Sequence, residues 1–199
     1  MLQQATINTR YFHKRRNFIM DAQTCILTRR SVRQFTEEAV SHETIEQIVS
    51  LASYAPSWKN TQISRYIAIE NPTIQQEIIE KYCLPGSNNP NIIASAPVLI
   101  AQTFVKSRSG FERDGSFSTD REEGWQYYDC GIAAQTFCLA AHDLGLATVI
   151  MGIFDRKGLQ AYLEIPEEQE LMALIALGHP AQVGPAPKRK DVEVLLSYR

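Results

Sequence analysis

Three arginines and two hydroxyl residues are packed into positions 28–33 (TRRSVR) of this 199-residue chain. In an extended backbone the side chains alternate between two faces, which would place Arg29, Ser31 and Arg33 together. Arg30 would then point the other way. Each guanidinium offers paired donors in a fixed geometry that suits a phosphate. The stretch therefore indicates a phosphate site, and a solvated basic turn is the alternative.

Two further segments carry groups that could face a planar ligand. Residues 55–62 (APSWKNTQ) follow a predicted helix and present hydroxyl and amide groups. Amides donate and accept together, which suits the edge of a heterocycle such as the pyrimidine ring of a flavin. Residues 150–155 (IMGIFD) read as a strand that runs into Gly152, where backbone N–H groups can approach a flat ligand closely. A generic polar loop and an ordinary strand-to-helix turn are the alternatives.

Other kinds of site find little support in the chain. The basic run at 187–190 (PKRK) is by itself typical of a solvated charge cluster. The histidines are far apart and show no metal-ligand spacing with cysteine or carboxylate. Neither a phosphate-loop nor a dinucleotide fingerprint is present. We therefore expect no metal site and no nucleophilic catalytic residue. The four histidines are His13, His42, His142 and His179.

Bulk properties predict one compact domain over residues 20–199. The net charge of −2 argues against a general nucleic-acid binder. No apolar stretch approaches the roughly 20 residues that span a bilayer, so no membrane partner is expected. The four cysteines form no C-x-x-C pair, which favours reduced thiols and a cytoplasmic location. Residues 1–19 are basic and aromatic, and we expect a loosely ordered tail.

Periodicity and capping signals predict an α+β layer fold that mixes strands and helices. Ser41 can cap one helix, and Gly145 can close the longest. Two segments are expected to be irregular: a turn-rich loop at 84–91 and a polar loop or lid at 106–124. The predicted helices cover about 21–28, 41–55, 73–82, 125–144 and 155–163, and the predicted strands cover 67–69, 97–104, 146–151 and 171–177.

Taken in order, these segments resemble the FMN-dependent nitroreductase family. The similarity covers about residues 21–196. The motifs that carry it are RRSVRxF at 29–35, APSxxNxQ at 55–62, APVLI at 96–100, LAAHDLGL at 139–146, ALGHP at 176–180 and PKRK at 187–190.

The resemblance implies a three-layer α+β fold in which helices flank a central, mostly antiparallel sheet. It also implies an intertwined homodimer with FMN at the subunit interface. The residues at the family's cofactor positions are Arg29, Arg30, Ser31, Arg33, Pro56, Ser57, Asn60, Met151, Gly152, Lys188 and Lys190.

The same resemblance assigns roles to these positions. Arg29, Arg30 and Ser31 would contact the phosphate and ribityl chain of FMN. Lys188 and Lys190 would complete the phosphate site. Arg33 lies near the N1 and O2 edge of the flavin. The residues at 56, 57 and 60 reach the flavin from the partner subunit. The backbone at 151–152 faces the ring near N5.

Some positions depart from the family pattern. Ile63 and Ser64 stand where a Pro-Trp pair is common, and Trp58 is bulky where small residues prevail. Met151 replaces a frequent glutamate, which would make that edge less polar. These departures bear on the substrate rather than on the cofactor.

The activity implied is hydride transfer from NADH or NADPH through FMN to a nitroaromatic, a quinone or a free flavin, in two half-reactions. The cofactor carries the chemistry, so no side-chain acid or base is expected. The acceptor site should be open and apolar, with Trp58 and Phe117 or Trp125 as walls. A protein that stores or senses FMN without turnover is one alternative. A specialised flavin enzyme of the same superfamily, for fragmentation, dehalogenation or dehydrogenation, is another.

Overall fold

The computed structural model describes residues 20–199, and the predicted tail at 1–19 lies outside the described residues. A four-stranded sheet runs through the centre of the molecule in the order β1-β2-β4-β3. The strands are β1 (Ser64–Ile69), β2 (Val98–Val105), β3 (Ala147–Met151) and β4 (Gln169–Gly178). The helices are α1 (Ala22–Thr28), α2 (His42–Ala52), α3 (Pro72–Tyr82), α4 (Asn89–Ser95), α5 (Gly124–Asp143), α6 (Arg156–Tyr162) and α7 (Val192–Leu195), with a short 3₁₀ turn at Trp58–Asn60.

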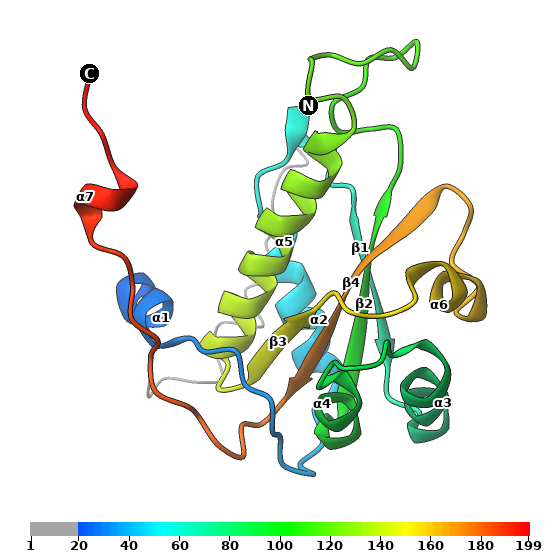
Figure 1. Ribbon diagram of the computed structural model, residues 1–199, viewed down its shortest axis with the longest axis vertical. Helices are drawn as coiled ribbons and strands as arrows, with labels where there is room; N and C mark the ends of the chain where they lie inside the picture. Colours follow the sequence, from blue (N-terminus) through cyan, green and yellow to red (C-terminus); the bar gives the residue numbers. More distant parts are fainter. Residues whose placement is uncertain (1–19) are drawn as a thin grey trace, which may run out of the picture.

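Helices cover both faces of this sheet, which gives three layers (Figure 1). Every strand pair is antiparallel. Successive side chains of a strand point to opposite faces, so Ile100 of β2 packs with α2 and α5 while Leu99 packs with α3, α4 and α6. Burial on both faces explains the apolar run at 98–101, the first half of β2. The predicted α+β class, with helices flanking an antiparallel sheet, is confirmed.

The long helix α5 covers one face of the sheet together with α2. It packs on α2 through apolar residues such as Phe137 and Ile48, both fully buried. It ends in a Schellman motif: the N–H of Gly145 donates to the carbonyl of His142, and the N–H of Leu146 donates to that of Ala141. Gly145 adopts a φ of +80°, which favours glycine.

Helix α4 is the main departure from the predicted elements, because part of the expected loop at 84–91 is helical. Its Pro90 occupies the first turn, where the missing N–H costs nothing. The Asn-Pro pair therefore begins a helix here instead of a turn. Ile92 and Ile93 behind it are buried against the sheet. Helix α7 was also not expected from the sequence.

The basic segment after α1 is attached to the sheet at β3. The N–H of Val32 donates to the carbonyl of Thr148 at 3.0 Å, and Ser31 forms a parallel bridge to the same residue. Val32 and Phe35 are buried in the core below. Phe35 also bridges to Pro180, just beyond the end of β4. Two buried apolar residues thus fix a segment whose polar side chains face outward.

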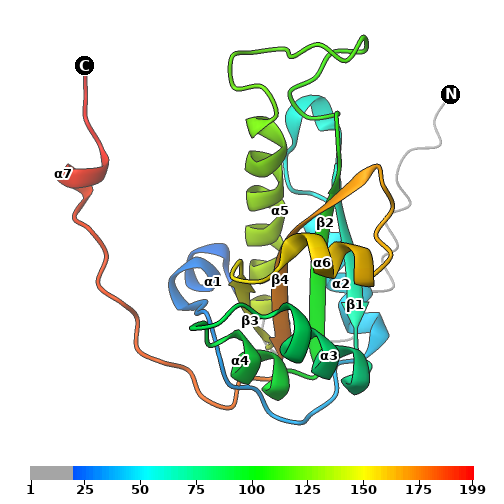
Figure 2. The ribbon, with the colours of Figure 1, turned by 45° about the vertical axis from the view of Figure 1, so that its right-hand side comes forward.

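Residues 181–199 form an arm that leaves the body of the molecule (Figure 2) and is exposed along its whole length. The arm carries α7 near its end. Its apolar side chains, such as Leu195 at 70% exposure, contact no core. In the part of the chain that is described, no helix has the length and apolarity needed to cross a membrane.

Gly178 offers a test of how the basic segment is held. A Cβ at this position would lie 2.6 Å from Cδ of Pro97 and 3.2 Å from Cδ1 of Phe35. We expect Gly178→Ala to lower the free energy of unfolding by about 1–3 kcal/mol in urea titrations, because neither neighbour can move without disturbing the core. Gly124→Ala is the control, since its nearest neighbour would be 3.9 Å away. Equal stability of both variants would contradict the close packing described here.

Candidate functional site

The basic segment presents guanidinium groups that no carboxylate of residues 20–199 neutralises. Arg30 donates through Nη1 to the carbonyls of Leu27 and Arg29, at 2.7 and 2.8 Å. Arg33 donates to the carbonyl of Ser31 at 3.3 Å. Within residues 20–199, none of the arginines at 29, 30 and 33 forms a salt bridge. Their remaining donors are free for an anion.

His142, at the C-terminal end of α5, lies near these positive charges. Nε2 of His142 lies 2.8 Å from the hydroxyl of Thr28. Burial lowers the pKa of His142, Arg29 and Arg30 lower it further, and Asp143 opposes them. Burial is the larger cause, and the contributions of Arg29 and Arg30 show that positive charge gathers at this corner, as an anion site requires.

The predicted segment at 150–155 lies on the same edge of the sheet, where β3 ends. Met151 is three residues beyond Thr148, or about 10 Å along β3. Its side chain is 4% exposed and lies in the core, so this position can meet a ligand only through its backbone. Gly152 is exposed, and a Cβ there would have no neighbour within 4 Å. Ile150 and Ile153 beside it are exposed apolar residues, which suits a flat ring.

The loop at 55–62 is held in a strained conformation. Lys59, Asn60 and Gln62 have φ values of 45°, 56° and 48°. Such backbone conformations persist only where the surroundings impose them, and they concentrate at functional sites. Here the Ser57 hydroxyl accepts from the N–H of Gln62 at 3.0 Å, and Asp129 on α5 accepts from the N–H of Trp58 at 2.9 Å.

Residues 106–123 connect β2 to α5 and are called the excursion below. Aromatic rings gather where the loop at 55–62 meets this excursion. The ring centroids of Trp58 and Trp125 are 4.8 Å apart, and Tyr128 lies 5.6 Å from Trp125. Phe111 and Phe117 pair within the excursion at 4.9 Å. Two of the predicted wall residues, Trp58 and Trp125, are therefore brought into contact, although they are far apart in sequence.

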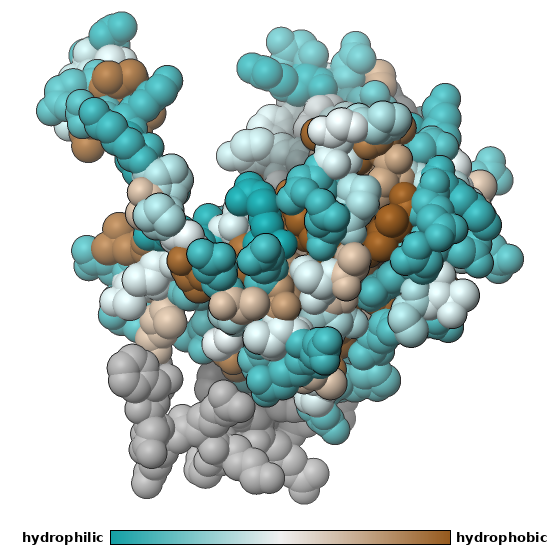
Figure 3. Space-filling view, turned by 60° about the horizontal axis from the view of Figure 1, so that its bottom comes forward, coloured by the Kyte–Doolittle hydropathy of each residue, from teal (hydrophilic) through white to brown (hydrophobic). Residues whose placement is uncertain are grey.

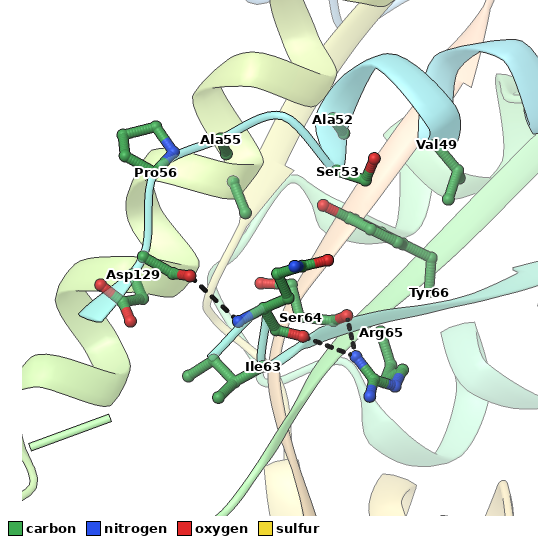
Figure 4. Close-up of a pocket in the computed structure, with 13 residues that line it drawn as sticks. Val49, Ala52, Ser53, Ala55, Pro56, Ile63, Ser64, Arg65, Tyr66 and Asp129 are labelled. Carbon is green, nitrogen blue, oxygen red and sulfur yellow. Dashed lines mark hydrogen bonds between the residues drawn. The ribbon is translucent and has the colours of Figure 1, made fainter. Parts of the chain in front are cut away.

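A cavity of about 320 Å³ lies between α2, the loop and β1 (Figure 4). Pro56 and Asp129 lie on one side of it, and Tyr66 lies on the other. The Tyr66 hydroxyl is buried and has no hydrogen-bond partner among the described residues. Burial raises the pKa of Tyr66, so this hydroxyl stays protonated and can donate.

The basic segment and the loop lie in opposite corners of the molecule. Ser64, just after the loop, pairs with Phe104 of β2, which in turn pairs with Glu170 of β4. On the other side of β4, Thr148 pairs with Leu177. Glu170 and Leu177 are about 23 Å apart along β4, and three strand spacings add about 14 Å across the sheet. Side chains of the two groups in one chain therefore cannot meet on one small ligand.

The remaining predicted residues lie on the arm. Lys188 and Lys190 are exposed, and neither forms a hydrogen bond or ion pair within the described range. In the same range, no three His, Cys, Asp or Glu side chains gather to hold a metal ion. Sequence reasoning missed Asp129 and Ser109, because neither stands in a recognisable motif.

Comparisons with known proteins place the chain among similar sequences. The sequence profile of the nitroreductase family matches residues 26–84 and 86–179. A protein of Methanothermobacter thermautotrophicus, provisionally named NADH dehydrogenase/NAD(P)H nitroreductase, is 32% identical over 167 residues, which cover 82% of this chain and 79% of the relative. The FMN reductase (NAD(P)H) of Bacillus subtilis is 30% identical over 161 residues, which cover 76% of this chain and 63% of that protein.

One solved structure adds a ligand. A provisionally assigned nitroreductase from Desulfovibrio desulfuricans, crystallised in complex with FMN, is 29% identical and superposes with a TM-score of 0.72. The match covers 89% of this chain and 96% of that chain.

The positive corner predicts an unusual titration of His142. We expect its pKa in the ligand-free protein to lie below the ordinary value of about 6.5. The folded state favours the neutral imidazole, so this group stabilises the fold above pH 6.5 and the stability is lost as the pH falls below it. Arg29→Met should raise the pKa of His142, as followed by NMR of the histidine rings. A pKa at or above the ordinary value would contradict the cation cluster.

Proposed function

The chain belongs to the nitroreductase family, and from this we propose that it is an FMN-dependent oxidoreductase. It passes hydride equivalents from NAD(P)H to a small-molecule acceptor, which is a nitroaromatic, a quinone or a free flavin. The observation that carries the proposal is the alignment of unneutralised arginines with an open backbone at Gly152 along one sheet edge.

The donor set along this edge fits the two ends of FMN. Arg29, Arg30 and the exposed Ser31 hydroxyl supply charge-assisted and neutral donors for the phosphate. Lys188 and Lys190 on the arm would complete that site. The exposed backbone around Gly152, flanked by apolar residues, suits the ring.

When bound, FMN supplies a ring that takes hydride from the nicotinamide and releases it to the acceptor. Arg33 would hold a positive charge beside the N1 and O2 edge, which favours negative charge there. The chain's other residues bind and orient, so we assign no side-chain acid or base. Trp58 would form a wall for the acceptor. The four cysteines are unpaired, which fits a reducing, cytoplasmic location.

We place each FMN between two copies of the chain. One small ligand cannot contact both the basic segment and the 56–60 loop of one chain, because these groups are roughly 25 Å apart. A second copy resolves this if it brings its own Pro56, Ser57 and Asn60 to the first copy's sheet edge. A homodimer would then hold two equivalent sites.

The surface supports such a dimer. Ile26 and Leu27 on α1 are 62% and 61% exposed, and Tyr128 on the outer face of α5 is 62% exposed. The arm that projects from the body also carries exposed apolar side chains (Figure 3), among them Val194 and Leu195. Apolar surface of this extent on α1, α5 and the arm indicates a protein partner, and a second copy would cover it.

An anaerobic titration of the FMN-loaded protein tests the activity. We expect NADH or NADPH to bleach the flavin absorbance, and a quinone or nitroaromatic to restore it, because both reactants use the same ring. The two donors, added separately, show the preference. A yellow protein that neither donor reduces would contradict the reductase and favour storage or sensing. A protein that binds no flavin would contradict the cofactor site itself.

Subunit complementation tests the shared site. Arg29→Ala should weaken FMN binding about tenfold or more, since a charge-assisted hydrogen bond contributes about 1.5–3 kcal/mol. Ser57→Ala with Asn60→Ala should weaken it from the partner side. Chains of the two kinds, co-expressed with different tags, form heterodimers in which one site is intact. We expect one tightly bound FMN per heterodimer, measured by fluorescence titration.

The homodimers of each variant are the controls, and neither should bind FMN tightly. Heterodimers that bind no better than their parents would show that both groups of residues serve the same chain's site. Exposed Arg113 gives a matched control, because Arg113→Ala removes a guanidinium away from the basic segment and should leave FMN affinity unchanged.

A further inference from the structure

Asp129 is a buried carboxylate with no cationic partner among residues 20–199. It lies in the second turn of α5, is 4% exposed, and forms no salt bridge. Its Oδ2 accepts two hydrogen bonds, from the N–H of Trp58 at 2.9 Å and from the hydroxyl of Ser109 at 2.5 Å. Burying a charge without a counterion is costly unless its hydrogen bonds are good.

These bonds join three separate parts of the chain. Trp58 belongs to the strained loop, Ser109 belongs to the 106–123 excursion, and Asp129 belongs to α5. Ser109 is fully buried, and its hydroxyl lies 2.7 Å from that of Thr61 at the far end of the loop. The loop is thus tied at its middle, at Trp58, and near its far end, at Thr61, to one buried polar centre.

The other link between loop and excursion is weaker. Lys59 contacts Glu112 at 2.9 Å, but both side chains are about half exposed. Exposed ion pairs contribute little because water screens them. The backbone bond from Asp129 acts directly on Trp58, whose ring packs on Trp125 one turn before Asp129 on the same helix.

We propose that Asp129 is a positioning residue that fixes Trp58 as a preformed wall for planar aromatic acceptors. The inference rests on the proposed function for the identity of the reaction, but the positioning itself does not. Asp129 touches neither cofactor nor acceptor in this proposal; it acts through the backbone of Trp58. Loss of its bonds would release the strained loop and leave the Trp58 ring without a defined orientation.

The first arm of the test needs no cofactor. The chain has two tryptophans, Trp58 and Trp125, and their contact should give an exciton couplet in circular dichroism. We expect the couplet to disappear in Asp129→Ala and to persist in Asp129→Asn, because a single amide oxygen can accept both bonds. Trp58→Phe identifies the signal. Asp120→Asn is the control: it removes the same charge from an exposed position in the excursion and should leave the couplet unchanged.

The second arm measures the oxidative half-reaction of the dithionite-reduced, FMN-loaded protein. Menadione serves as the planar aromatic acceptor, and ferricyanide serves as an acceptor that needs no stacking. We expect Asp129→Ala to raise the half-saturating concentration of menadione at least tenfold and to leave ferricyanide within twofold. Asp129→Asn should stay within threefold of the unaltered protein for both acceptors.

An intact couplet in Asp129→Ala, or an equal loss for both acceptors, would overturn the proposal. Should Asp129→Ala not fold, Ser109→Ala carries the test, since it removes one of the two bonds and leaves the carboxylate paired with Trp58. The couplet should then weaken and menadione binding should fall severalfold. A protein that binds no FMN contradicts the proposed function alone, because the circular dichroism of the flavin-free chain still tests the positioning of Trp58.

Discussion

The distance across the sheet between the basic segment and the loop at 55–62 is the main constraint on the site. The basic segment pairs with β3 and the loop leads into β1, and these two places are roughly 25 Å apart. The sheet sets this distance, and it is rigid because its residues pack on two buried faces. An arginine side chain reaches only a few ångströms, so rotamer changes cannot close such a gap. Under the proposed function, the groups that serve one ligand come from two chains, and a second copy would cover the exposed apolar surface of α1, α5 and the arm.

The loop and the basic segment are held in place by different means. The basic segment is an extended strand-like stretch that two buried residues, Val32 and Phe35, hold against the core. The loop has no such apolar anchor facing the core. It contains three left-handed residues, and hydrogen bonds to Asp129 and Ser57 hold its backbone in this conformation. Polar bonds hold this half of the site, and their geometry determines where Trp58 points.

Local signals predicted most of the elements. The cap at Ser41 and the closing Gly145 appear as expected, since each depends only on residues within four positions along the chain. The helix at α4 was missed because an Asn-Pro pair suits a turn and a helix start equally well. Strand β1 extends further toward its N-terminus than the predicted 67–69, because pairing with β2 orders residues with no apolar pattern of their own.

The sequence by itself determined most of the helices and strands and the family, because capping, periodicity and ordered motifs are properties of neighbouring residues. Only the tertiary structure decided that Met151 faces the core, that the two groups of predicted site residues lie in opposite corners, and that Trp58 contacts both the ring of Trp125 and the carboxylate of Asp129. These features depend on contacts between residues far apart in the sequence, such as Trp58 with Asp129 and Val32 with Thr148. Such contacts arise from how layers pack, and no local pattern in the chain records them.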